Sequence, residues 1–323
     1  MRRRSDRSQT QLQVTAERVR RSIRRRLLFA NVAGAVAVMT FLQLASGKEL
    51  APDVPLWAQV VGSLAPVVVL LLVPAYLWGH RAFTRAIAWA LEGRTPTQPE
   101  RFAVLGEPWR QALRPLVFWV LGAILYGAIT ALVGAGFITV VRVVEGTLIG
   151  GVTTCALAYL MIERSFRPLF AHVLDGMPER RPRTPGIRIR LLLTWAVGSG
   201  VPLLAMALVL FLDGTEIPPY ALAMLALVGL AAGFIATVSS ARSVAEPLDG
   251  VRHALARVRD DDLDVGLVVD DGGEVGEVQS GFNQMVDGLR ERRQIQDLFG
   301  RHVGQAVATQ ALERGTGLRG EQA

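Results

Sequence analysis

The chain has 323 residues and is unusually apolar, since 51% of them are hydrophobic and only 20% are charged. Its mean hydropathy of +0.34 excludes an ordinary soluble domain and favours a membrane protein. The formal net charge is +7. Cys155 is the only cysteine and lies inside an apolar run, which excludes an intrachain disulfide and a cysteine-based metal site. We expect it to be a small buried hydrophobe.

The N-terminal arm, residues 1–26, is polar and rich in arginine. It does not have the pattern of a cleavable signal peptide, because the lead is long and the apolar run after it is too long for an h-region. Basic clusters can bind nucleic acid, but in this chain the arginines flank apolar runs. Membrane topology and anionic lipid therefore explain them, and we expect no nucleic-acid partner.

Six apolar runs are long enough to cross a bilayer, which takes about 20 mostly apolar residues. They are Leu27–Ser46, Trp57–Trp78, Pro115–Val140, Val143–Ile162, Leu191–Leu212 and Pro219–Ser239. The third and fourth are separated only by a tight link around Arg142. Gly229 and Gly233 in the last run have the spacing of a small-xxx-small contact, which predicts close helix packing. The sequence thus predicts a six-span membrane domain over residues 27–240.

The placement of arginine predicts the orientation of these spans. Arginines are concentrated in the N-terminal arm and in the long links after the second and fourth runs, whereas the other links are short and nearly neutral. In the link after the fourth run they are Arg164, Arg167, Arg180, Arg181, Arg183, Arg188 and Arg190. We expect both termini and both long links on the cytoplasmic side of a bacterial inner membrane. We interpret the long links as basic surface connectors with one interfacial helix each.

The outer links are too short to fold into a sensory domain, so a stimulus must enter the membrane, act at the outer rim, or come from lipid or a partner protein. The interiors of the spans hold few polar residues, which argues against a transporter. Arg142 and Glu145 lie three residues apart at an expected helix start, and we interpret them as a pair at the rim.

After Ser240 the pattern becomes amphipathic. Pro247 suits a first helical turn, where its missing N–H costs nothing. Leu248, Val251, Leu255 and Val258 follow at steps of three and four, which is typical of a coiled-coil seam. A second seam begins after Glu274, whose charge suits a helix start. It comprises Val275, Val278, Phe282, Met285 and Leu289.

The segment Arg259–Gly273 between the two seams cannot continue the helix, because Asp260–Asp262 repel one another and Gly272-Gly273 breaks it. Its apolar residues Leu263, Leu267 and Val269 predict a connector that packs back onto the helices. The aspartates lack the alternating ligand spacing of a calcium loop, so we interpret them as a solvated connector. Two such short helices have little core alone, which predicts a parallel homodimeric four-helix bundle.

The order of these elements resembles the HAMP module, a two-helix relay of bacterial receptors. The resemblance is carried by Pro247, by Glu274 with Gly276, and by Phe282-Asn283 with Met285, and it assigns residues 241–293 to a HAMP domain. It implies a module that passes a conformational signal and does no chemistry. The residues that we expect to form the relay are Pro247, Leu248, Val251, Leu255, Val258, Glu274, Gly276, Val278, Phe282, Asn283, Met285 and Leu289.

The run Leu298-Phe299-Gly300-Arg301-His302-Val303-Gly304, with Ala306–Ala308 and Gly320-Glu321, has a second resemblance. It is similar to the segment that enters the catalytic domain of class III adenylate cyclases, in particular actinobacterial ones with six spans and a HAMP domain. The resemblance implies that residues 294–323 are a coiled-coil linker toward a cyclase domain, and that the chain is truncated before that domain. Magnesium or manganese would belong to that domain, and we expect no catalytic, cofactor-binding or metal-binding residue in this chain.

The expected fold is therefore all-α, with a six-helix transmembrane bundle, a HAMP helix–connector–helix and a signalling helix. The expected function is that of the membrane sensor and relay portion of an adenylate cyclase, without catalysis of its own. A sensor for a kinase or a methyl-accepting receptor is an alternative, as is a stand-alone regulator that dimerises with full-length cyclases. The expected partners are the lipid bilayer, a second copy of the chain and, under the regulator alternative, a full-length cyclase.

Overall fold

The computed structural model describes residues 2–50, 53–174, 185–213 and 218–315, and all regular structure among them is helical. The predicted all-α class is confirmed for this part of the chain. Arg180, Arg181, Arg183 and Gly320-Glu321, which the sequence analysis singled out, lie outside it. The chain divides into two compact units. We call Met1–Glu246 with Val269–Gly276 the membrane unit, and Pro247–Val268 with Glu277–Ala323 the hairpin unit.

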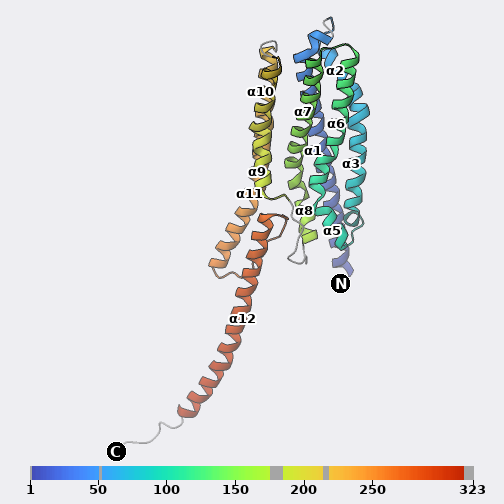
Figure 1. Ribbon diagram of the computed structural model, residues 1–323. Coiled ribbons are helices and arrows are strands. Elements are labelled where there is room, and N and C mark those ends of the chain that lie inside the picture. The colour runs from blue at the N-terminus through green and yellow to red at the C-terminus, as the bar shows by residue number, and fades with distance from the viewer. Residues whose placement is uncertain (1, 51–52, 175–184, 214–217, 316–323) are drawn as a thin grey trace, which may run out of the picture. The chain divides into compact units, whose positions relative to one another are not determined.

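The membrane unit consists of long helices joined by short ones (Figure 1). In chain order they are α1 (Arg2–Leu50), α2 (Leu56–Val67), α3 (Val73–Ala86), α4 (Ala88–Leu91), α5 (Gln98–Leu105), α6 (Glu107–Leu132), α7 (Phe137–Glu163), α8 (Arg167–Leu174), α9 (Ile187–Trp195) and α10 (Val201–Asp213). Helix α11 (Pro219–Arg259) begins in the membrane unit and ends in the hairpin unit, and α12 (Glu274–Gly315) has only its first three residues in the membrane unit. Three short helical turns, η1 (Val68–Leu72), η2 (Arg164–Phe166) and η3 (Ala196–Gly200), complete the set.

Five helical stretches among the described residues are long and apolar enough to cross a membrane. They are Gln9–Ala45, Glu107–Leu132, Phe137–Leu174, Ile187–Leu208 and Pro219–Arg259. These spans indicate a multi-pass membrane protein. The remaining predicted span, Trp57–Trp78, is divided between α2, η1 and α3, so the count of six stays a prediction.

The division of that span has a physical cause in its prolines. Both η1 and η3 are π-helical, and each is followed two residues later by a proline, Pro74 and Pro202 respectively. Proline lacks an N–H, and its ring collides with the carbonyl four residues earlier. A wider π turn at that carbonyl accommodates the ring without ending the helical path.

The boundary between the third and fourth predicted spans is wrong. Helix α6 ends at Leu132, and the chain reverses through Gly134, whose φ of 85° is readily adopted only by glycine. The new helix starts at Phe137, so Arg142 is inside α7, is 7% exposed, and donates to the carbonyl oxygen of Ala45 at 3.1 Å. The apolar run Phe137–Val140 hid this turn, because it continues the hydrophobicity of α6.

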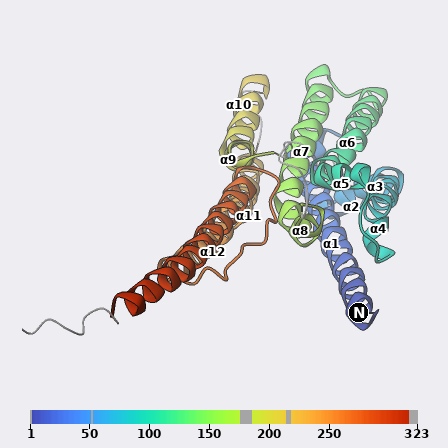
Figure 2. The same cartoon turned by 90° about the horizontal axis from the view of Figure 1, so that it is seen from below.

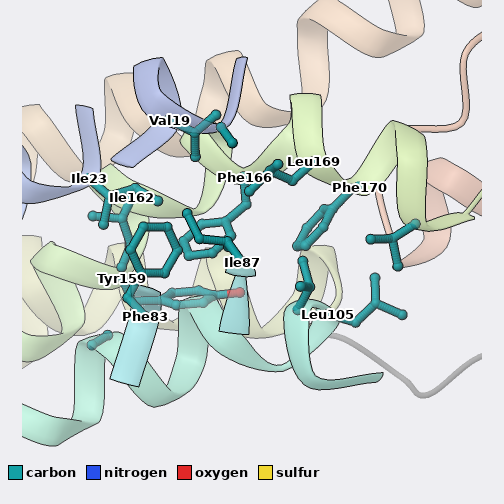
Figure 3. Packing of buried hydrophobic residues seen from close by; sticks show 14 of the residues in the cluster. Val19, Ile23, Phe83, Ile87, Leu105, Tyr159, Ile162, Phe166, Leu169 and Phe170 are labelled. Carbon is teal, nitrogen blue, oxygen red and sulfur yellow. The ribbon is translucent and has the colours of Figure 1, made fainter. Parts of the chain in front are cut away.

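The main core lies at the end of the membrane unit that carries the N-terminus, where α5 and α8 pack near α1 (Figures 1 and 2). The rings of Phe83 and Phe166 meet edge to face, with centroids 5.5 Å apart, and Ile23 and Tyr159 lie in the same cluster (Figure 3). The two long links are therefore not surface connectors. Their residues Ile87, Trp89, Val104, Leu105, Phe166, Leu169, Phe170 and Val173 are at most 2% exposed. The arginines that dominate these links concealed short helices with one apolar face each.

The predicted close packing at Gly229 and Gly233 is confirmed. A Cβ at Gly233 would lie 2.6 Å from the Cα of Gly198 in η3, and one at Gly229 would lie 2.9 Å from the ring of Pro202 in α10. Absence of side chains at these positions lets α11 approach the preceding span backbone to backbone.

Candidate signal-relay site

Helix α11 carries one buried face from the membrane unit into the hairpin unit. Ser240, Ser243, Pro247, Val251 and Ala254 are buried at steps of three and four residues, which is the repeat of a single helix face. The helix is unbroken from Pro219 to Arg259. The expectation that Pro247 starts a new helix is therefore wrong, because the proline lies inside α11.

A hydrogen bond explains how the helix tolerates Pro247. A proline cannot donate to the carbonyl four residues earlier, which here belongs to Ser243. The Nη2 atom of Arg167, on α8, donates to this carbonyl oxygen instead. Nearby, Nη2 of Arg164 lies 2.5 Å from a carboxylate oxygen of Glu246. Two arginines of the membrane unit thus hold the last turn of α11 before the hairpin.

The aspartates after α11 end the helix. The N–H of Asp261 donates to the carbonyl oxygen of Val258, and that of Asp262 to the carbonyl oxygen of Arg257, each at 3.0 Å. With Asp261 at a φ of 66°, this is the Schellman motif. The Arg257 guanidinium, 2.6 Å from the Asp262 carboxylate, holds the pKa of Asp262 below its usual range. The Asp262 carboxylate is thus paired with an arginine at the surface, in keeping with a solvated connector.

Two side chains of α12, the second helix of the hairpin, form hydrogen bonds with the backbone of the connector. The Asn283 side chain accepts from the N–H of Leu267 and donates to its carbonyl oxygen, both at 2.8 Å. The Arg290 guanidinium donates to the carbonyl oxygens of Leu263 at 2.7 Å and Val265 at 3.2 Å. Backbone groups that have no strand or helix partner are satisfied in this way. The prediction that the connector packs back onto the helices is confirmed.

Each hairpin helix has two apolar rows, where the sequence analysis expected one seam. Ala254, Val265, Phe282 and Val286 form the core of the hairpin, with Val258 and Leu267 packed against them. In contrast, Leu248, Leu255, Val278, Met285 and Leu289 are exposed by 36% to 48%. The expected seam residues therefore divide between an internal core and a second row, which we call the open row: Leu248, Leu255, Val278, Met285 and Leu289.

The end of the connector and the first residues of α12, together Val269–Gly276, belong to the membrane unit. Val269 packs against the main core, and Asp271 is 1% exposed. The Nη2 atom of Arg190, at the start of α9, lies 2.9 Å from Oδ2 of Asp271 and 3.0 Å from Oε1 of Glu163, at the end of α7. Arg190 is 3% exposed and Glu163 4%. One buried arginine thus joins α7, α9 and the connector.

Glu274 and Gly276, which we call the Glu-x-Gly corner, lie directly after this cluster. The Glu274 carboxylate accepts from the N–H of Ile187 at 2.9 Å, and so caps the first turn of α9. A Cβ at Gly276 would lie 1.7 Å from the carbonyl oxygen of Asp271. The glutamate therefore connects the start of α12 to a membrane helix, and the glycine allows the connector to cross that start closely.

Sequence reasoning missed Glu163, Arg167, Arg190, Asp271 and Arg290. Arg190 and Asp271 are 81 residues apart, and neither belongs to a periodic pattern. The available signal was indirect, since an arginine directly before an apolar run, as Arg190 is, must find a partner if it is buried. Among the residues searched, no group of three or more His, Cys, Asp or Glu side chains could hold a metal ion.

The HAMP domain family matches residues 240–291, which confirms the resemblance drawn from the motifs. Over its length the chain is similar to uncharacterized proteins of mycobacteria. It is 36% identical over 304 residues to Rv1318c of Mycobacterium tuberculosis, covering 91% of this chain and 55% of that protein. It is 35% identical over 313 residues to Rv1319c of the same species, covering 94% and 58%. The protein Mb1354c of Mycobacterium bovis is 36% identical over 303 residues, covering 92% and 53%.

The chain thus spans little more than half the length of the curated relatives that it matches. No solved structure matches it. The HAMP match indicates a role in signal relay.

Proposed function

We propose that the chain is the sensing and relay part of a membrane receptor, in which movement of the membrane helices is passed to the HAMP hairpin. The observation that carries this proposal is the unbroken helix α11, which has one buried face through the membrane span and into the hairpin. Because α11 is one continuous helix, we expect a rotation or tilt of the span to be passed along it to the hairpin. A difference of a few kcal/mol between two hairpin arrangements is enough for such a switch.

The relay acts as a parallel homodimer. The open row is supporting evidence, because five large apolar side chains on one small hairpin remain exposed in a single copy. Two helices with a core of only a few residues are marginal alone, whereas two hairpins form a four-helix bundle with a closed core. Both copies enter the membrane from the same side, so the bundle is parallel.

Disulfide crosslinking in membranes tests the dimer. The full chain is made cysteine-free by Cys155→Ala, and single cysteines are introduced as Leu248→Cys and Leu255→Cys on the open row. Both are expected to crosslink between copies under mild oxidation. Arg252→Cys is the matched control, since Arg252 lies on the same helix with a side chain 76% exposed. Absence of crosslinks at both leucines, or equal crosslinking at Arg252, would contradict the dimer.

The output of the relay is an adenylate cyclase domain. The resemblance of the Leu298–Ala308 run to the entrance of class III cyclases supports this proposal. The greater length of the mycobacterial relatives leaves room for such a domain. We expect the purified chain to form no cyclic AMP from ATP with Mg²⁺ or Mn²⁺. Under the same conditions the full-length relative Rv1318c should form it. Cyclic AMP from the chain would overturn its role as a relay without catalysis, and none from the relative would overturn the cyclase output.

The chain lies in the bacterial inner membrane with its N-terminus, long links and HAMP hairpin in the cytoplasm. The arginines of the arm and of the long links support this orientation. Labelling of single cysteines in intact cells with a membrane-impermeant maleimide tests it. Glu49→Cys in the first outer link should react, and Glu92→Cys in the first long link should not.

A further inference from the structure

The membrane unit contains the two chain segments that lead into the hairpin, and it binds each of them through its own side chains. The first is the last turn of α11, which Arg164 and Arg167 hold from α8 and the turn before it. The second is the start of α12, where Asp271 binds Arg190 and Glu274 caps Ile187. The second contact does not involve α11, because both of its membrane-side groups are in the first residues of α9.

We infer that the buried cluster of Glu163, Arg190 and Asp271 is a second input to the relay, by which α9 sets the position of the start of α12 independently of α11. We call this cluster the connector latch. The inference rests on the proposed relay function and names a route of regulation within it. It predicts that two membrane helices, the span that begins with α9 and the last span, α11, each control one helix of the HAMP hairpin.

The geometry of the latch indicates that a movement of α9 is passed to the connector. Arg190 is shared between Asp271 on the connector and Glu163 on α7, at 2.9 and 3.0 Å. All three side chains are almost fully buried, so water cannot take the place of a lost partner. A shift of α9 along α7 therefore either carries Asp271 with it or leaves a buried charge unpaired. The connector also crosses the start of α12 closely, since a Cβ added at Gly276 would lie 1.7 Å from the carbonyl oxygen of Asp271.

The test uses the full chain in native membranes, with Cys155→Ala and single cysteines at either Val278 on α12 or Leu248 on α11. Crosslinking rates between copies are compared with and without Asp271→Asn, which keeps the shape of the side chain and removes its charge. We expect the rate at Val278 to change at least fivefold and the rate at Leu248 to change less than twofold. Arg188→Gln is the matched control, since it removes an exposed arginine two residues from Arg190 and should alter neither rate.

Arg190→Gln should reproduce the effect of Asp271→Asn, and Arg190→Lys, which keeps the charge, should restore part of the rate. Hydrogen exchange at Phe166 and Leu169 checks that each variant keeps the main core. If Val278 does not respond, or both positions respond equally, the second input is overturned while the dimeric relay stands. If no position crosslinks even without Asp271→Asn, the relay proposal fails and the latch as an input fails with it. The N–H of Gly273 donates to Oδ1 of Asp271 at 2.7 Å. Faster exchange of this amide in Asp271→Asn, with an unchanged rate at Val278, would show that Asp271 is only a local anchor and would overturn the second input.

Discussion

At Gly276, in the first turn of α12, there is no room for a side chain. An added Cβ would lie 1.7 Å from the carbonyl oxygen of Asp271, a backbone atom that cannot move aside as a flexible side chain would. We expect Gly276→Ala to destabilise the membrane unit by about 1–3 kcal/mol, the usual cost of overpacking. Gly288→Ala is the control, because it lies in the same helix with nothing within 4 Å of its Cβ, and it should be neutral or stabilising.

Thermal unfolding in detergent, followed by limited proteolysis of the connector, distinguishes the two variants. The connector of Gly276→Ala should be cut faster than that of the native chain. Equal melting temperatures and equal cleavage rates of the two glycine variants would show that position 276 does not require glycine.

Glu274 gives the junction a defined pH dependence. Hydrogen bonds from its own N–H and from the N–H of Ile187 hold the pKa of its carboxyl below the ordinary 4.5. The stabilisation is therefore complete above pH 4.5 and is lost as the pH falls through the lowered pKa. The amide resonance of Ile187 should move with this protonation and should stay fixed over the same range in Glu274→Gln. A titration that persists in the variant would assign the effect to another group.

Within α11, Pro247 and the Arg167 contact form one structural element, because Arg167 donates to the carbonyl oxygen that the proline cannot reach. Arg167→Met should cost about 1–3 kcal/mol, because it leaves the buried carbonyl of Ser243 without a donor. In a Pro247→Ala background the loss should be smaller, since the alanine N–H can bond to that carbonyl. A double-mutant cycle on thermal unfolding measures the coupling. Additive effects would mean that Arg167 does not replace the missing helical bond.

The elements differ in how far the sequence alone could predict them. Periodic apolar residues predicted both hairpin helices, and the Gly229 and Gly233 spacing predicted the close packing of α11 on the preceding span, because these signals are local. The start assigned at Pro247 was wrong, since a partner 80 residues away supplies what the proline lacks. The latch could not be predicted at all, because the pairing of Arg190 with Asp271 depends on the path of the connector. The open row was mixed with the core row, because both rows recur at helical spacing.

For the whole molecule, we propose that movement of the membrane helices changes the arrangement of the HAMP hairpin. Gly233 offers a way to move the last span without a known stimulus. A larger side chain there meets the backbone of Gly198 and should push α11 away from η3. Gly62 offers a matched control, because it lies in the membrane unit with nothing within 4 Å of its Cβ.

The most direct measurement is the distance between spin labels on Gln294→Cys in the two copies of the Cys155→Ala chain, by pulsed electron paramagnetic resonance in nanodiscs. Gln294 is an exposed residue of α12, and its label reports the arrangement of the hairpin. We predict that Gly233→Leu shifts or splits the distance distribution, and that Gly62→Leu leaves it as in the native sequence. Identical distributions in all three proteins, with the dimer intact, would contradict the account.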